Sequence, residues 1–136
     1  MIVDTSALVA VARAERDWEP IWDALQSELG FIPAPVLVEL NRVTSDKNNV
    51  LHAGVVQLLE TLATCKIVVE SFSARDAQAA VVANPLYGSG NGKGGLLNML
   101  DLMVYGMANA RGLPILFTGH DFATTDALIH PASRIG

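Results

Sequence analysis

The sequence is short of cysteine, of positive charge and of long apolar runs, and each shortage excludes a class of protein. Cys65 is the single cysteine, so no disulfide can form within the chain, and a small secreted domain stapled by disulfides is excluded. The longest apolar segment, residues 96–110, is interrupted by Asp101, so we expect no membrane span. Residues 1–4 carry no basic side chain and end in an acid, which predicts no signal peptide and a reducing, cytoplasmic location.

Positive charge is scarce as well. Nine lysines and arginines stand against 14 aspartates and glutamates, which gives a net charge of −5 and argues against binding nucleic acid by bulk positive charge. It does not exclude a nucleic-acid enzyme whose positive charge arrives as bound metal. With 136 residues, 51% of them hydrophobic and 17% charged, the chain suits one folded domain with a sizeable core and is unlike a disordered segment.

The spacing of apolar residues, together with capping and breaking residues, predicts short strands that alternate with helices. The predicted strands are 1–3, 31–32, 66–70 and 114–117. The predicted helices are 7–13, 17–29, 36–44, 50–64, 74–83 and 98–111, with a glycine-rich loop over 84–95. This alternation predicts an α/β fold, a single domain over residues 1–136 whose central parallel sheet is covered by helices on both faces.

One carboxylate stands out because its surroundings are apolar. Asp101 lies within 96–104, and no cation occurs three or four residues away to pair with it along the helix. A carboxylate is costly to bury without a partner. Tertiary hydrogen bonds, an early position in the helix or a metal ion would each supply one.

Three further acids could likewise have either a structural role or a ligand-binding role. Asp4 and Asp121 follow predicted strands, at the edge where open α/β sheets place their ligands, but an acid there also caps a helix. Glu39 is flanked by apolar residues, with Arg42 three positions on as a possible surface ion-pair partner.

Taken together, the four acids indicate a divalent cation. Carboxylates that converge on one edge raise one another's pKa unless cations neutralise them, and oxygen-only ligands favour Mg²⁺ or Mn²⁺. Zinc is a poor fit because its usual ligands are dispersed along the chain: His52, Cys65, His120 and His130.

Three segments carry a resemblance to a known family. Residues 1–8, MIVDTSAL, resemble the opening of PIN-domain proteins, especially the VapC ribonuclease toxins of toxin–antitoxin pairs. Residues 97–108, LNMLDLMVYGMA, are similar to the family's third acidic motif, and residues 114–126, PILFTGHDFATTD, resemble its closing motif. Glu39 falls where the family places a helical glutamate. The chain departs from the family at Leu100, where the family usually has glycine before the third acid, and at Leu102.

The resemblance implies a sheet of about five strands and a site at its carboxyl edge. The implied metal ligands and catalytic residues are Asp4, Glu39, Asp101 and Asp121. Ser6 and Asp126 would support these ligands, and Asn98 and Thr118 would lie near them. Three cations are candidates for holding the RNA backbone: Arg13, Arg42 and Lys93.

The implied activity is Mg²⁺- or Mn²⁺-dependent hydrolysis of structured RNA by a metal-activated water. The implied partners are an RNA substrate, a cognate antitoxin protein and a second copy of the chain in a homodimer. Two alternatives stay open. Leu100 favours a catalytically degenerate PIN-like module that only binds a partner. The other is a phosphatase or receiver-like domain with Asp4 as nucleophile, although position 6 is serine where that chemistry usually has a second acid.

Overall fold

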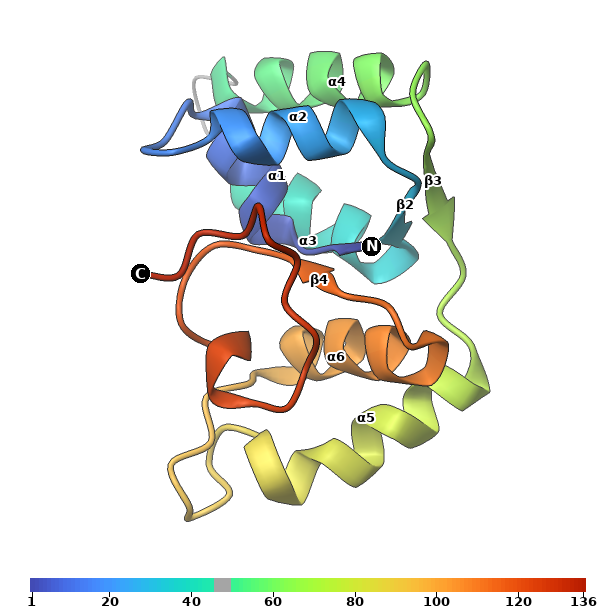
Figure 1. The fold of residues 1–136 in the computed structure, drawn as a ribbon, viewed down its shortest axis with the longest axis vertical. Helices are drawn as coiled ribbons and strands as arrows, with labels where there is room; N and C mark the ends of the chain where they lie inside the picture. The colour runs from blue at the N-terminus through green and yellow to red at the C-terminus, as the bar shows by residue number, and fades with distance from the viewer. Residues whose placement is uncertain (46–49) are drawn as a thin grey trace.

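A four-stranded parallel sheet forms the centre of the computed structural model, which describes residues 1–45 and 50–136 (Figure 1). The strands are β1 (Ile2–Val3), β2 (Gly30–Pro33), β3 (Ile67–Glu70) and β4 (Ile115–Leu116), in the order β3-β2-β1-β4. Ile2 of β1 opposes Phe31 on one side and Ile115 on the other. Each strand agrees to within one residue at either end with a predicted range.

The sheet has four strands, where the family resemblance implied about five. The segment after β4 returns beside it but pairs only at isolated bridges, Ile129 with Ile115 and Arg134 with Thr118. Pro131 lies between these bridges and has no N–H to donate, so a continuous ladder does not form there. The implied number of strands is therefore wrong by one.

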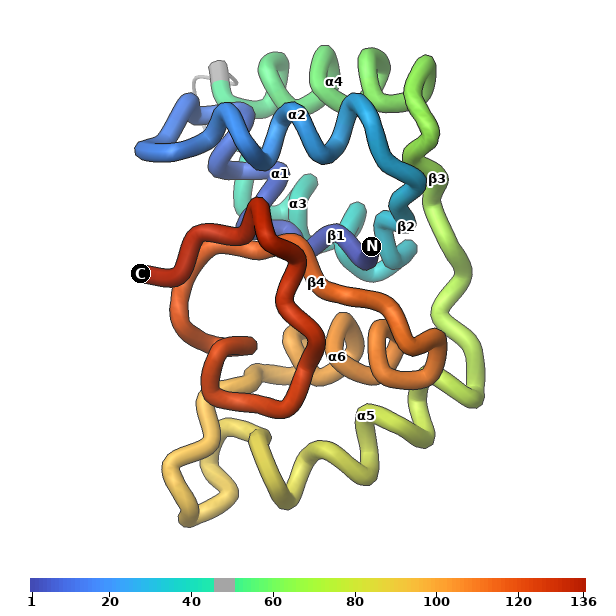
Figure 2. The backbone as a smooth tube through the Cα atoms, viewed as in Figure 1, coloured from blue at the N-terminus to red at the C-terminus, as the bar shows by residue number. Residues whose placement is uncertain are grey.

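Helices cover the sheet on both sides, as predicted. In Figure 1, α1, α2 and α4 lie on one side of the strands, and α5 and α6 lie on the other. The path of the chain between these layers is followed most easily in Figure 2. None of the described helices is long and apolar enough to cross a membrane. Their bounds are α1 Thr5–Ala12, α2 Glu19–Ser27, α3 Ala34–Thr44, α4 Val50–Leu62, α5 Ala74–Tyr87 and α6 Met99–Arg111.

Helix α5 runs four residues beyond its predicted end at residue 83 and contains Pro85. A proline in the last turn removes only its own N–H, and the N–H of Gly88 still donates to the carbonyl of Asn84 to close the helix. The loop that follows is pinned at its base by a bridge between Gly88 and Leu97. The predicted loop over 84–95 is accordingly shorter.

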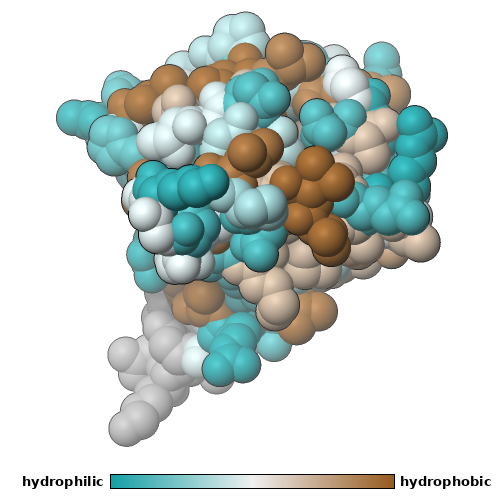
Figure 3. Space-filling view, turned by 90° about the horizontal axis from the view of Figure 1, so that it is seen from below, coloured by the Kyte–Doolittle hydropathy of each residue, from teal (hydrophilic) through white to brown (hydrophobic). Residues whose placement is uncertain are grey.

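The core lies on both faces of the central strands. Ile2, Val3, Ile115 and Leu116 have no exposed surface, which accounts for their unbroken apolar sequences. Hydrophobic side chains also remain on the surface. On α5 and at the start of α6 they include Val81, Val82, Leu86 and Met99, and the view from below shows hydrophobic patches between polar ones (Figure 3).

Candidate active site

The four acids singled out from the sequence line one cleft. Asp4 follows β1, Asp121 follows the neighbouring strand β4, Glu39 projects from α3, and Asp101 lies in the first turn of α6. The cleft has a volume of about 300 Å³, and its other lining residues are Thr5, Ser6, Val9, Glu15, Val43, Thr118 and Phe122. Residues separated by more than a hundred positions therefore meet at the carboxyl edge of the sheet, where open α/β folds place ligands.

Asp4 is held by a short chain of hydrogen bonds. It is 6% exposed, and its Oδ2 accepts from the N–H of Ser6 at 3.1 Å and from the Ser6 hydroxyl. The Ser6 hydroxyl in turn accepts from the N–H of Thr118 at 3.0 Å. Burial raises the pKa of Asp4, the Ser6 hydrogen bonds lower it, and the charge of Glu39 raises it further. Asp4 thus both caps α1 and lines the cleft, so the two roles considered for it coexist.

Asp101 is fixed by a capping box at the start of α6. Its N–H donates to Oδ1 of Asn98 at 2.8 Å, and its Oδ2 accepts from the N–H of Asn98 at 3.0 Å. The pKa of Asp101 is raised to about 7, chiefly by burial, and the charges of Asp4, Asp121 and Glu39 contribute to this rise. The Asn98 hydrogen bond opposes it. A carboxylate in a capping box ordinarily has a low pKa, so here burial, aided by the neighbouring carboxylates, outweighs the capping hydrogen bond.

The other two acids are more open. Asp121 is exposed at the N-terminal end of the 3₁₀ turn Phe122–Thr124, and its side chain makes no capping hydrogen bond there. Glu39 is half-buried, and no ion pair joins it to Arg42 within the described part of the chain. The surface ion pair considered for Glu39 is therefore absent from the described residues, and Glu39 instead lines the cleft.

The cleft contains two polar groups that sequence reasoning missed. Oε2 of Glu15 is buried without a hydrogen bond and lies 3.9 Å from Nη2 of Arg134. The hydroxyl of Thr5 is likewise buried without a partner. Glu15 sits in the charged run 13–17, which is typical of a surface turn, and left-handed backbone at Ala14 and Asp17 folds that turn toward the site. No local pattern marks this contact.

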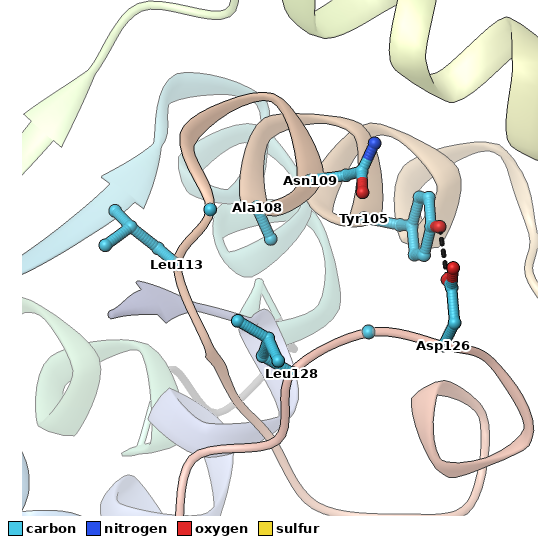
Figure 4. Close-up of a pocket in the computed structure, with 8 residues that line it drawn as sticks. Tyr105, Ala108, Asn109, Leu113, Asp126 and Leu128 are labelled. Carbon is cyan, nitrogen blue, oxygen red and sulfur yellow. Dashed lines mark hydrogen bonds between the residues drawn. The ribbon is translucent and has the colours of Figure 1, made fainter.

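Other candidate residues lie outside the cleft lining. Asn98 acts on Asp101 through the capping box, and Asp126 accepts a hydrogen bond from Tyr105 beside a separate small cavity (Figure 4). The three candidate cations are all exposed and come from separate elements: Arg13, Arg42 and Lys93. Arg42 lines an apolar groove that shares Glu39 with the acid cleft.

The side chain of Leu100 does not enter the cleft. It lines the neighbouring apolar groove, and Leu102 lines another groove between α5 and α6. The two departures from the family pattern therefore leave the space between the four carboxylates open. This geometry removes the one sequence observation that favoured a catalytically degenerate module.

The donor chemistry of the cleft suits a hard divalent cation. Its ligands would be carboxylate oxygens, which Mg²⁺ and Mn²⁺ prefer, and the pKa values of Asp4 and Asp101 are raised by burial and by the neighbouring carboxylates. Across residues 1–45 and 50–136, no three His, Cys, Asp or Glu side chains are gathered closely enough to hold an ion as they stand. Cation binding would therefore draw the carboxylates inward from the cleft walls.

The fold and the cleft define an α/β domain with an acidic site at the carboxyl edge of a parallel sheet. Comparison with known proteins gives the same result, because the PIN domain family model matches residues 1–128. The chain belongs to the PIN domain family, as its motifs suggested. It is 37% identical over 133 residues to ribonuclease VapC42 of Mycobacterium tuberculosis, covering 97% of this chain and 98% of that protein.

One further relative and one solved structure are also similar to this chain. VapC ribonuclease Mb0625 of Mycobacterium bovis is 34% identical over 127 residues, which cover 92% of this chain and 93% of that protein. Among solved structures, VapBC2 from Rickettsia felis bound to a promoter DNA fragment aligns with a TM-score of 0.68 at 15% identity. That alignment covers 99% of this chain and 96% of the other and supports the fold alone.

Proposed function

We propose that this protein is a VapC-type endoribonuclease toxin that hydrolyses RNA phosphodiester bonds with Mg²⁺ or Mn²⁺. The observation that carries the proposal is the convergence of Asp4, Glu39, Asp101 and Asp121 on one cleft, with the pKa of Asp101 raised to about 7. Relatives at 37% and 34% identity over nearly the whole chain are named ribonucleases, which supports the same activity.

The four carboxylates would hold the cation, and the cation when bound would lower the pKa of a water to supply the nucleophile. The chain's own contribution is to orient the carboxylates. Oδ2 of Asp4 is held by Ser6 and Oδ2 of Asp101 by the N–H of Asn98, so one oxygen of each carboxylate is fixed by the chain itself. Thr118, bound to the Ser6 hydroxyl, fixes the end of β4 next to Asp4.

The alternative with Asp4 as a covalent nucleophile has less support. Ser6 occupies the position where that chemistry needs a second acid, and its hydroxyl is bound to Asp4. Such a mechanism also gives no role to Glu39 and Asp101, which lie in the same cleft.

The decisive experiment incubates purified protein with a structured RNA and Mg²⁺ or Mn²⁺, beside Asp4→Asn and Asp101→Asn. Wild type should cleave, and each variant should lose at least about a hundredfold in rate because a metal ligand is removed. Cleavage that survives in both variants would rule out the metal site. A folded wild type that cleaves no RNA would instead favour a module that only binds a partner.

We propose two protein partners, a cognate antitoxin and a second copy of this chain. Support comes from structural neighbours described as toxin–antitoxin complexes and from an exposed apolar groove of about 670 Å³ next to the cleft. The groove's lining includes Pro35, Val38, Phe72, Met99 and Met103. Light scattering on the purified chain should give a dimer mass at micromolar concentration, and a monomer at every concentration would contradict the homodimer.

The RNA backbone would meet the chain at its few exposed cations. Arg42 is the best placed of the three candidates because it lines the groove that shares Glu39 with the cleft. An RNA substrate and a protein antitoxin would both be met in the cytoplasm, which is where we place the protein.

A further inference from the structure

A side-chain hydrogen bond ties together the two segments that carry Asp101 and Asp121. The hydroxyl of Tyr105 on α6 donates to Oδ1 of Asp126 at 2.5 Å (Figure 4). Tyr105 lies four residues after Asp101, one turn along the same face of α6. Asp126 lies five residues after Asp121, just beyond the 3₁₀ turn that Asp121 begins. The bond therefore spans from one acid-bearing segment to the other.

The donor end of this bond is rigid. Tyr105 is 5% exposed, and its ring packs against that of Tyr87 with centroids 5.6 Å apart. Burial raises the pKa of Tyr105, and the Asp126 carboxylate raises it further, so the hydroxyl remains a donor over the physiological range. The acceptor end is exposed, beside a cavity of about 60 Å³ lined by both partners and Asn109 (Figure 4).

The Asp121 turn is also held by one backbone hydrogen bond and one ring contact. The N–H of Gly119 donates to the carbonyl of Arg134, and the ring of Phe122 packs edge-on against that of Phe117. Since Asp121 makes no capping hydrogen bond of its own, its place relative to Asp101 is set by the two ends of this turn. The Tyr105–Asp126 bond is the side-chain tether from the turn to α6.

We infer that Tyr105 is a positioning residue for the cation site, which it serves by fixing the Asp121 turn against the first turns of α6. The inference rests on the proposed function. Asp126 serves as the anchor for this tether. Asp126 lies outside the lining of the cleft and bonds Tyr105, so its contribution is one of position.

The test compares Tyr105→Phe with Tyr87→Phe, a matched control that removes one hydroxyl from the ring packed against Tyr105. Mn²⁺ affinity is measured by calorimetry, and RNA cleavage is followed as a function of Mn²⁺ concentration. Tyr105→Phe should weaken Mn²⁺ binding about tenfold and shift the half-saturating Mn²⁺ concentration by the same factor, with most of the rate recovered at saturation. Tyr87→Phe should match wild type in both.

Two further variants separate positioning from general destabilisation. Asp126→Asn keeps an acceptor oxygen for the Tyr105 hydroxyl and should bind Mn²⁺ more tightly than Asp126→Ala. In an Asp121→Asn background, Tyr105→Phe should weaken Mn²⁺ binding no further, because the carboxylate that it positions is already gone. A purely structural role would lower Tm in both backgrounds and would weaken binding in both.

The outcomes are distinguishable from failure of the proposed function. If wild type binds Mn²⁺ and cleaves RNA while Tyr105→Phe binds Mn²⁺ equally well, the positioning role is wrong and the proposed function stands. If folded wild type neither binds Mn²⁺ nor cleaves RNA, the proposed function fails and takes this inference with it.

Discussion

At the scale of single residues, two of the acids that line the cleft also make hydrogen bonds that cap helices, so one side chain serves the fold and the proposed metal site. Asp4 caps α1 and Asp101 completes the capping box of Asn98 at the start of α6, yet both have a raised pKa because they are buried next to other carboxylates. A cap alone would favour the charged form. The direction of the shift therefore shows that burial and neighbouring carboxylates outweigh the capping hydrogen bonds at both acids.

The raised pKa of Asp101 predicts how stability depends on pH. The unfolded chain releases this proton near pH 3.8 and the folded protein near pH 7, so between these values the folded state binds more protons. The free energy of unfolding of the metal-free protein should therefore fall as pH rises from 5 to 8. After allowance for solvent screening, Asp101→Asn should stabilise it at pH 8 by about 1 kcal/mol, roughly 4 °C in Tm.

Thermal unfolding in EDTA at pH 5 and pH 8 checks this prediction. The amide introduced by Asp101→Asn retains an oxygen that can accept from the N–H of Asn98, so the capping box is conserved in this variant. At pH 5 the difference should be only about a third of that at pH 8, because the unfolded chain has already released this proton while Asp101 in the fold still holds it. An Asp101→Asn protein that is less stable than wild type at pH 8 would show that the carboxylate stabilises the metal-free fold.

At the scale of elements, the sequence was sufficient for the strands and insufficient for the contacts between distant segments. Runs such as 66–70 are short, β-branched and bounded, so all four strands were located. The end of α5 differs from the predicted one because Pro85 is tolerated in the last turn of the helix. The expected fifth strand does not form because Pro131 interrupts the segment that returns beside β4.

The residues of the site and its surroundings also fall into two groups, those marked by a local sequence signal and those brought together only by tertiary contacts. The four acids were identified because each sits at a strand end or in an apolar helix, which is a local signal. Glu15 joins the cleft through a turn with left-handed residues, and Tyr105 meets Asp126 across 21 positions. Neither contact has a periodicity or motif that points to it, so both are known only from the tertiary fold.

The packing of α5 on α6 gives a prediction with an internal control. A Cβ at Gly106 of α6 would lie 2.4 Å from the carbonyl oxygen of Asp76, which is backbone and cannot give way by rotating. Gly106→Ala should therefore cost about 2 to 3 kcal/mol in the free energy of unfolding. Gly54 of α4 has nothing within 4 Å of its Cβ position, and Gly54→Ala should stabilise by about 0.5 to 1 kcal/mol.

Urea unfolding of the two variants measures both effects. Gly106→Ala should also lower nuclease activity, because α6 carries Asp101 and a displaced helix moves that carboxylate relative to Asp4. Equal stability of the two alanine variants would mean that α5 and α6 separate easily at this crossing.

At the scale of the whole molecule, the net charge of −5 belongs mainly to the cleft. Without the four carboxylates the net charge would be −5 + 4 = −1, so the rest of the chain is nearly neutral. One or two divalent cations in the cleft would remove most of the repulsion toward RNA. The acidic composition is then compatible with an RNA substrate.

This charge distribution predicts that RNA binding and RNA cleavage respond differently to different cations. In EDTA the acid cleft should repel RNA, and affinity measured by fluorescence anisotropy should rise at least about tenfold on addition of Mg²⁺ at constant ionic strength. Cobalt hexammine neutralises charge but keeps its ammine ligands, so it should restore binding without cleavage, whereas Mg²⁺ and Mn²⁺ should restore both. Asp4→Asn/Asp101→Asn, with two charges removed from the cleft, should bind RNA in EDTA more tightly than wild type. If wild type bound RNA equally well in EDTA and in Mg²⁺, the acidic cleft would lie away from the bound RNA, and the four carboxylates would not act on its phosphodiester bonds.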